Sequence, residues 1–188
     1  MKNFSRPVEM NLPMRSTFSP PLAVPRRKDR TLETVLNKDG MAVSVTIEVT
    51  ETPDEAALAR VETELAAFND ADVGPSEKAT LAIIVRDENG AVLAGISGYT
   101  AWGWLYIQKL WVDDSLRGQG MAGRMLAAAE EEAERRGCHS ARIDTFNPSA
   151  EKAYTRQGYV EFGRLENFPI GRSRIFLQKR LPSSHTKI

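Results

Sequence analysis

The spacing of apolar residues along this chain becomes regular from Val43 onward. Apolar residues first alternate with polar ones, which is typical of a strand with one buried face, at Val43, Val45, Ile47 and Val49. They then recur at helical spacing, at Leu58, Val61, Leu65 and Phe68. Thr52–Glu55 precedes this second stretch and supplies an N-cap, a proline for the first helical position and a capping-box acid. The pattern predicts a strand followed by an amphipathic helix that ends near Asn69.

The rest of the chain continues to alternate strand and helix patterns. Strands are predicted at Thr80–Arg86, Ala91–Tyr99, Leu105–Val112, Ala141–Phe146, Tyr159–Arg164 and Arg174–Lys179, and helices at Arg124–Arg136 and Ser149–Gln157. Glu88-Asn89-Gly90 is a hairpin signal between the first two of these strands. This order predicts an α/β protein with a central mixed sheet of about six or seven strands and helices on both faces.

The first forty residues have a different composition. Five of the ten prolines fall by Pro25, a small basic cluster follows at Arg26–Lys28, and the apolar residues show no period. Such a segment buries too little apolar surface to offset the entropy of ordering its backbone. We therefore expect a disordered tail or a start-site extension over residues 1–40, one domain over 41–182, and a short C-terminal tail over 183–188.

Composition narrows the functional classes. The 25 basic and 25 acidic residues balance, so we expect no nucleic-acid or membrane partner, while a homodimer stays open. The single cysteine, Cys138, cannot form an intrachain disulfide, which favours a reducing, cytoplasmic location. Two histidines offer too little for a histidine-based metal site, and no apolar run approaches a membrane span. We expect no metal.

The most informative segment joins a predicted strand to a predicted helix. After Leu105–Val112 and a polar turn, the chain reads Arg117-Gly118-Gln119-Gly120-Met121-Ala122-Gly123. Glycines at a helix start let the backbone approach a ligand closely, and the free N–H groups of the first turn favour negative charge. With Arg117 and Arg124 flanking it, this segment is predicted to bind a phosphate group.

Three kinds of phosphate site were compared on spacing. A P-loop needs Lys-Ser/Thr after its last glycine, and Arg124-Met125 stands there instead. The dinucleotide pattern G-x-G-x-x-G is matched by the three glycines, and Asp144 lies about twenty residues on. However, a turn separates the strand from the first glycine, and too few residues remain after Asp144 for a doubly wound sheet. A dinucleotide-dependent oxidoreductase is therefore the weaker alternative.

The third kind of phosphate site agrees with the glycine segment and also with a second segment further along the chain. Arg117-x-x-Gly120-x-Ala122 resembles the Q/R-x-x-G-x-G/A signature of the GNAT superfamily of acetyl-CoA-dependent N-acetyltransferases. Downstream, the family's N-x-x-A-x-x-x-Y-x-x-x-G-F/Y segment is matched by Asn147, Ala150, Tyr154, Gly158 and Tyr159. The two motifs stand in the family's order, and the resemblance covers roughly residues 45–181.

The resemblance implies a GNAT-like fold with acetyl-CoA as co-substrate. In that fold two neighbouring strands splay apart and admit the pantetheine arm, which would pair with the backbone of Leu110, Trp111 and Val112. The pyrophosphate would lie on Arg117, Gly118, Gln119, Gly120, Met121, Ala122 and Gly123, and Asn147 would contact the pantetheine. Trp111, alternating with its neighbours, is expected to pack in the core rather than on the ligand.

The resemblance also implies the chemistry, which is direct attack of a primary amine on the thioester. Tyr154 is the candidate general acid for the departing thiolate, and a backbone N–H near Val112 is the candidate oxyanion donor. The general base is open: Gln108 and Lys109 stand where many relatives carry a glutamate. The remaining carboxylate candidates are Glu48, Asp113, Asp144 and Glu161.

The acceptor is equally open between a small-molecule amine and a protein N-terminus or lysine. Four aromatic residues near the expected mouth are candidates for lining an acceptor pocket: Tyr99, Trp102, Trp104 and Tyr106. A non-enzymatic alternative also stands, namely an acetyl-CoA-binding but inactive sensor or interaction module.

Overall fold

The computed structural model describes residues 30–182, and the chain divides into two compact units that meet between Arg60 and Val61. In the first unit, β1 (Arg30–Leu36) and β2 (Ala42–Glu48) form an antiparallel hairpin. The Asn37 side chain closes its turn, because its Oδ1 accepts the backbone N–H groups of Asp39 and Met41 at 3.0 and 2.9 Å. The sequence predicts β2 but not β1, which lies within the predicted tail of residues 1–40.

The predicted first helix is present as α1 (Glu55–Val73), which spans the boundary between the units. It begins later than the start signals indicate. Asp54, rather than Thr52, caps it: the Asp54 Oδ1 accepts the Ala56 N–H at 3.2 Å, and the Asp54 carbonyl accepts the Leu58 N–H at 3.1 Å.

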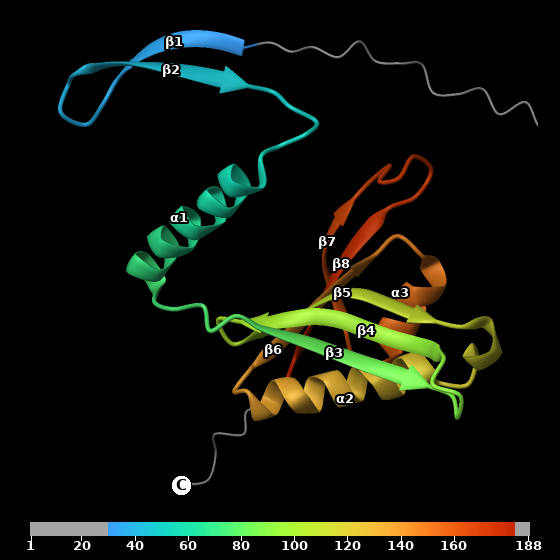
Figure 1. Cartoon of the computed structure of the whole chain (residues 1–188). Helices are drawn as coiled ribbons and strands as arrows, with labels where there is room; N and C mark the ends of the chain where they lie inside the picture. Colours follow the sequence, from blue (N-terminus) through green and yellow to red (C-terminus); the bar gives the residue numbers. More distant parts are fainter. Residues whose placement is uncertain (1–29, 183–188) are drawn as a thin grey trace, which may run out of the picture. The chain divides into compact units, whose positions relative to one another are not determined.

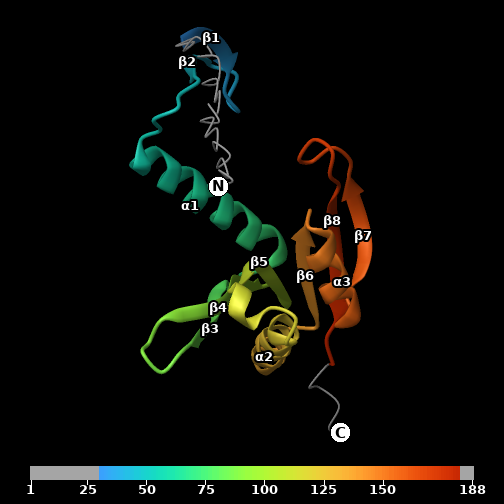
Figure 2. The ribbon, with the colours of Figure 1, turned by 90° about the vertical axis from the view of Figure 1, so that its right-hand side faces the viewer.

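The second unit is built on a six-stranded mixed sheet. Its strands are β3 (Ala79–Arg86), β4 (Val92–Ala101), β5 (Trp104–Val112), β6 (Ser140–Thr145), β7 (Val160–Leu165) and β8 (Arg174–Arg180). They lie in the order β3-β4-β5-β6-β8-β7. Only β5 and β6 run parallel; the other neighbours in this sheet are antiparallel. Figure 2 shows the strands in two groups, with β3, β4 and β5 at the left and β6, β8 and β7 at the right.

Besides the C-terminal part of α1, this unit contains a 3-10 turn and two helices. The turn η1 (Asp114–Leu116) leads from β5 into α2 (Met121–Arg135), which packs on β3, β4 and β5 (Figure 1). The helix α3 (Pro148–Arg156) follows β6 and contacts both β6 and α2. Sheet and helices share one core whose most buried large side chains include Ile96, Leu105, Ile107, Leu126, Tyr159 and Leu177. Burying each aliphatic side chain of this kind stabilises the fold by about 1.5–3 kcal/mol.

The predicted strands and helices of this unit are all found, with small differences at their ends. The largest differences are that α1 ends at Val73 rather than near Asn69, and that α2 starts at Met121 rather than Arg124, so the last part of the glycine segment is helical. Within residues 30–182, no helix is both long and apolar enough to cross a membrane.

Candidate functional site

The strands β5 and β6 separate partway along their length. Their parallel pairing runs from Trp104↔Ser140 to Ile107↔Ile143 and then stops. Both strands continue beyond this point, β5 to Val112 and β6 to Thr145. Since both carboxyl ends point the same way, the two strands lie unpaired side by side at that end of the sheet, as the family resemblance predicts. We name this unpaired stretch between them the β5–β6 gap.

A β-bulge accounts for the separation. On the β4 side, Ser97 pairs with Lys109 and Gly98 with Ile107, so Gln108 is an extra residue in β5. An extra residue bends the strand that carries it, and it lies directly after the last residue of β5 that pairs with β6. Gly98 makes the bulge sterically feasible, because a Cβ on this residue would lie only 2.0 Å from the Tyr106 carbonyl oxygen.

Beyond the bulge, backbone groups of β5 face the gap. The Asp113 N–H donates to the Leu93 carbonyl at 2.8 Å, which fixes the alternation of hydrogen-bonded pairs with β4. By that alternation Trp111 presents its backbone groups to β4, whereas Leu110 and Val112 turn theirs toward the gap. Of the three residues predicted to pair with pantetheine, two are therefore oriented to do so.

The side chains of these three residues alternate as expected, with one difference. Leu110 and Val112 pack against the core, while Trp111 points away from it. The expectation that Trp111 is a core residue is wrong, because its side chain is 48% exposed.

The glycine turn presents unused N–H groups at the same end of the sheet. Gly118 and Gly120 have φ angles of +73° and +74°, and Gly120 is the N-cap of α2. Nothing lies within 4 Å of where their Cβ atoms would be, so the backbone here borders open space. None of the N–H groups from Gly118 to Gly123 donates to an acceptor within the described part of the chain. A row of free donors at a helix start, including Met121 and Ala122, suits an anion such as a pyrophosphate.

The other residues predicted to bind the phosphates have structural contacts of their own. The Arg117 Nε donates to the Val112 carbonyl at 3.0 Å, and its guanidinium pairs with Asp114. Gln119 Nε2 donates to the Ser115 carbonyl at 2.8 Å. A Cβ on Gly123 would lie 2.6 Å from the Gln157 amide nitrogen. Gly123 therefore also serves the close packing of α2 on α3.

Asn147 and Tyr154 lie on the other side of the gap, where β6 leads into α3. Asn147 is the N-cap of α3: its Oδ1 accepts the Ser149 N–H at 2.9 Å, which leaves its side-chain amide group free to donate. Tyr154 is only 5% exposed. Burial, and secondly the charge of Asp144, raises the pKa of Tyr154 to about 12. The phenol is therefore protonated throughout the neutral range.

The four carboxylates that the sequence offers as candidate general bases have different places and contacts in the structure. Glu48 belongs to β2 in the first unit. The Asp113 carboxylate caps η1 and accepts the Ser115 hydroxyl at 2.6 Å, a contact that lowers its pKa. The Glu161 carboxylate accepts two bonds from Arg164, at 3.0 and 2.6 Å, which also lowers its pKa. Only Asp144 stands on β6 where the gap begins.

The four aromatic candidates for an acceptor pocket divide between two places. Tyr99 and Tyr106 pack edge to face with centroids 5.3 Å apart, and the Tyr106 hydroxyl lies 3.5 Å from Asp144 Oδ1 at the start of the gap. Trp104 stands two residues before Tyr106 on the same strand and packs on His139 with centroids 5.6 Å apart. Trp102 lies in the preceding turn, where its Nε1 donates to the Gly74 carbonyl at 3.2 Å. The four side chains thus have two different sets of partners, and an acceptor pocket lined by all four stays a prediction.

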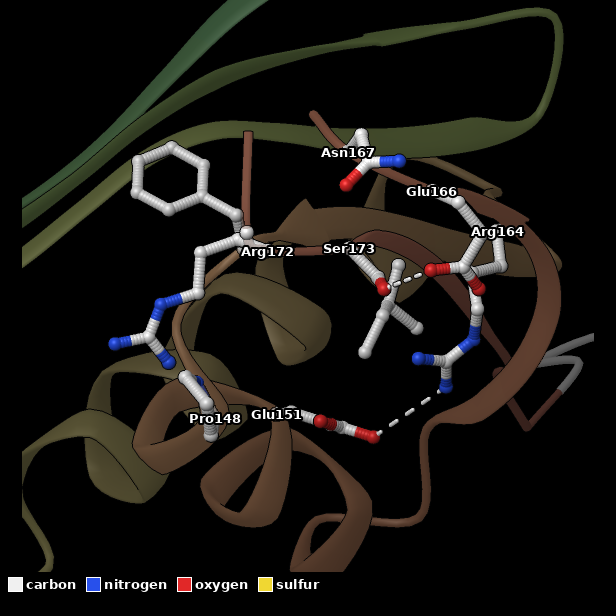
Figure 3. A pocket seen from close by; sticks show the side chains of 10 residues that line it. Pro148, Glu151, Arg164, Glu166, Asn167, Arg172 and Ser173 are labelled. Carbon is white, nitrogen blue, oxygen red and sulfur yellow. Dashed lines mark hydrogen bonds and ion pairs between the residues drawn. The ribbon is translucent and has the colours of Figure 1, made fainter. Parts of the chain in front are cut away.

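A polar cavity of about 420 Å³ lies between the start of α3 and the β7–β8 hairpin. Figure 3 shows Glu151 and Arg172 at its edge, and Arg164 and Glu166 on its β7 side. Its lining includes Phe146 and Pro148, which flank Asn147. The cavity therefore adjoins the carboxyl end of β6. No group of residues in the described ranges could hold a metal ion.

Sequence reasoning missed two functional features. One is the bulge, whose only signal is a glycine within a strand, at Gly98. The other is Arg174, whose Nε donates to Asp144 Oδ2 at 2.5 Å. Nothing in the sequence pairs these two residues, because their contact depends on how β6 meets β8.

Comparison with known proteins agrees with this geometry. The acetyltransferase (GNAT) family's sequence model matches residues 45–159. The acetyltransferase Atu2258 of Agrobacterium fabrum is 42% identical over 132 residues, which cover 70% of this chain and 96% of that protein. Blasticidin-S acetyltransferase of Streptomyces morookaense is 35% identical over 95 residues, covering 50% of this chain and 70% of that protein. A crystal structure of a candidate acetyltransferase from Agrobacterium tumefaciens, 41% identical, superposes with a TM-score of 0.70 over 73% of this chain and 100% of its own.

These findings decide against the dinucleotide alternative. A doubly wound sheet is mostly parallel, whereas the sheet of the second unit has one parallel pair among its five. The glycine spacing that both families share is therefore explained by the GNAT match.

Proposed function

Because the chain belongs to the acetyltransferase (GNAT) family, we propose that it transfers the acetyl group of acetyl-CoA to a primary amine of a small molecule. The separation of β5 from β6 carries this proposal. It brings the gap-facing backbone of Leu110 and Val112, the glycine turn and Asn147 to one end of one sheet. Acetyl-CoA has a part to match each group. Its pantetheine arm has amides that can pair with the strand backbone and with Asn147, and its pyrophosphate can bind the N–H groups of the glycine turn.

Each part of such a co-substrate has a complementary group in this chain. Leu110 and Val112 would receive the pantetheine amides as a further strand would, although the Val112 carbonyl already accepts Arg117. The free N–H groups of the glycine turn would receive the pyrophosphate. When bound, acetyl-CoA supplies an activated acyl group, and the Val112 N–H is placed to stabilise negative charge on its carbonyl oxygen.

Tyr154 is proposed as the proton donor for the leaving sulfur. A phenol with a pKa of about 12 keeps its proton at neutral pH and can hydrogen-bond a developing thiolate. Because an ordinary thiol has a pKa of about 8.5, complete transfer from such a phenol is uphill. A group that lowers the Tyr154 pKa during the reaction would therefore assist this step.

A small-molecule acceptor is favoured over a protein by two observations. The cavity beside Asn147, at about 420 Å³, has a volume typical of small-ligand sites. One relative, the 35% identical protein from Streptomyces morookaense, is named for acetylating a small molecule, blasticidin S. The proposal also places the enzyme in a reducing cytoplasm, since its one cysteine, Cys138, has no partner for a disulfide.

Binding and turnover test the proposal separately. Acetyl-CoA should raise the melting temperature by mass action, and Gly120→Glu should abolish this rise by placing bulk and negative charge at the free N–H groups. Gly137→Glu is the matched control, because Gly137 also has a positive φ, of +80°, and open space around it, but follows the far end of α2. The control should melt lower and still respond to acetyl-CoA.

Turnover is measured as CoA release with an amine panel of blasticidin S, ethylamine and a short peptide with a free N-terminus. Release with a small amine supports the proposal, and release with the peptide alone would move the acceptor class to proteins. A thermal shift with NADH and none with acetyl-CoA would contradict it. Acetyl-CoA binding without release to any amine would leave only the binding-module alternative.

A further inference from the structure

Asp144 occupies a distinctive position in the sheet. It follows Ile143, the last residue of β6 that pairs with β5, so it stands where the gap opens. Ile143 is 3% exposed in the core that α2 and α3 cover. Since successive side chains of a strand alternate between faces, Asp144 projects from the opposite face, where it meets Tyr106. Tyr154, on α3, belongs to the buried core on the other face.

The two carboxylate oxygens of Asp144 have different surroundings. Arg174 from β8 binds Oδ2, with its Nε at 2.5 Å and a second guanidinium nitrogen also in contact. Oδ1 has a single contact in the described part of the chain, the Tyr106 hydroxyl at 3.5 Å. That distance exceeds the range of a good O–H···O hydrogen bond. The side chain is 11% exposed, so one largely buried carboxylate oxygen keeps capacity for another donor.

From this geometry we propose that Asp144 is the general base, and that its Oδ1 receives a proton from the acceptor amine as that amine attacks the thioester. This inference rests on the function proposed above. The acceptor enters as a neutral amine, having lost one proton to solvent. Its nitrogen bonds to the carbonyl carbon, one N–H proton passes to Oδ1, the C–S bond breaks, and Tyr154 gives its proton to the sulfur. Asp144 then releases its proton to solvent and the Tyr154 oxygen takes one from solvent, which restores both groups.

The coupling between the two residues supports this assignment. The charge of Asp144 contributes to the raised pKa of Tyr154, second to burial. When Asp144 accepts a proton that charge disappears, so the phenol becomes a stronger acid just as the sulfur requires a proton. Two arginines belong to the same surroundings: Arg174, which keeps Oδ2 occupied, and Arg142, whose guanidinium stacks on Tyr106 at 4.0 Å. Further titratable groups around the Asp144–Tyr106 contact are Tyr106 itself, Tyr99, which packs on it, and Lys78, whose Nζ lies 4.9 Å from the Tyr99 ring centroid.

Asp144→Asn tests the proposal, because the amide keeps the shape of the carboxylate but cannot take the proton. With the best amine of the panel, kcat/KM should fall by about 10²–10⁴-fold, the range for a positioned base. Acetyl-CoA affinity measured by calorimetry should not change. The deficit should shrink as pH rises from 6.5 to 9.5, because hydroxide and free amine in solution then replace the base. A merely structural role would give a deficit that does not depend on pH.

Glu130→Gln is the matched control. Glu130 is also a buried carboxylate paired with one cation, Lys179 at 2.5 Å, but it lies on α2 within the core. This variant should melt lower and keep its turnover per folded molecule. If Asp144→Asn leaves Arg174 unpaired and fails to fold, the double variant Asp144→Asn with Arg174→Gln removes both charges and should show the same kinetic loss.

The outcomes separate the two proposals. Near-normal turnover in either Asp144 variant, a deficit constant with pH, or an equal loss in Glu130→Gln would overturn the assignment of Asp144 alone. A wild-type protein that turns over no amine of the panel would overturn the proposed function, and this assignment with it.

Discussion

The two ends of β5 differ in how they are paired: its start lies between two strands, whereas its end has a strand on one side only. At its start, Leu105 and Ile107 are 0% and 1% exposed, and the strand has a neighbour on each side. There Trp104 packs on His139, and the His139 N–H donates to the Gly103 carbonyl at 2.8 Å. Beyond the bulge the strand has a neighbour on one side only, and its free edge faces the gap.

Under the proposed function, one strand provides both stability and ligand binding. The paired end contributes buried apolar surface and complete hydrogen bonding, which stabilise the fold. The open end leaves backbone groups without partners, which is unfavourable in an empty sheet and useful only when a ligand supplies the missing bonds. Substitutions at the two ends should therefore change different measured quantities.

The largest effect is expected at Tyr154, on the open side. Tyr154→Phe keeps the ring and its packing but removes the proton, so kcat should fall by about 10²–10⁴-fold, or about 3–5 kcal/mol in barrier height. Acetyl-CoA affinity should not change. Tyr159→Phe, which removes another buried phenol from the same core, is the control and should keep kcat. Equal turnover of Tyr154→Phe and the wild type would leave solvent as the proton source.

The bulge is the boundary between the two ends, and Gly98→Ala should disrupt it. Because the new Cβ would meet the Tyr106 carbonyl at 2.0 Å, β4 and β5 must move apart. We expect a loss of about 2–4 kcal/mol in the free energy of unfolding, measured by urea denaturation. Gly163→Ala on β7 is the control, since its Cβ would meet only Phe176, at 4.0 Å. A Gly98→Ala protein as stable as this control would show that the bulge relaxes without cost.

A smaller effect follows from the pKa of Tyr154. In the unfolded chain the phenol ionises near its ordinary pKa of 10.0, and in the native state only near 12. Its contribution to stability is therefore complete below pH 10 and is lost as pH rises to about 12, a loss of about 2–3 kcal/mol. Urea unfolding between pH 9 and 12 should show a shallower decline for Tyr154→Phe than for the wild type. Parallel declines would mean that the native phenol ionises normally.

The smallest effect is expected at the paired end. His139→Ala removes the ring that packs on Trp104 and should lower the free energy of unfolding by about 1 kcal/mol. His139→Phe should recover much of this loss. Acetyl-CoA affinity and kcat should be unchanged in both variants. A clear kinetic defect would show that the two ends of β5 are coupled more strongly than their separate contacts indicate.

The elements of the second unit could be predicted because each is specified by local periodicity and by its own end signals. The glycine turn and the segment around Tyr154 could be predicted for the same reason. The hairpin strand β1 was missed, although Arg30–Leu36 contains the β-branched residues Thr31, Thr34 and Val35 before the Asn37 turn. Its proline-rich surroundings outweighed that short pattern.

The general base could not be chosen from the sequence. Four carboxylates were equivalent there, and what sets Asp144 apart as the proposed base is its place directly after the last β5–β6 pair, with Oδ1 left open while Arg174, thirty residues away, holds Oδ2. The exact place where β5 leaves β6 was equally inaccessible. A bulge depends on which residue of one strand faces which residue of the next, and local propensity carries no such information.

The extra residue of β5 also constrains how the length of this strand can vary. A strand places alternate side chains on opposite faces, and Gln108 interrupts that alternation, because Ile107 faces the core before it and Leu110 and Val112 face the core after it. Deleting Gln108 would join Ile107 to Lys109 and keep every later pairing with β4, so the core side chains would stay inside while the bend of the strand would be lost. Deleting a residue beyond the bulge would instead turn the later side chains to the opposite faces. In a random library screened for folding, deletion of Gln108, whose side chain is exposed, should therefore survive far more often than deletion of Leu110 or Trp111.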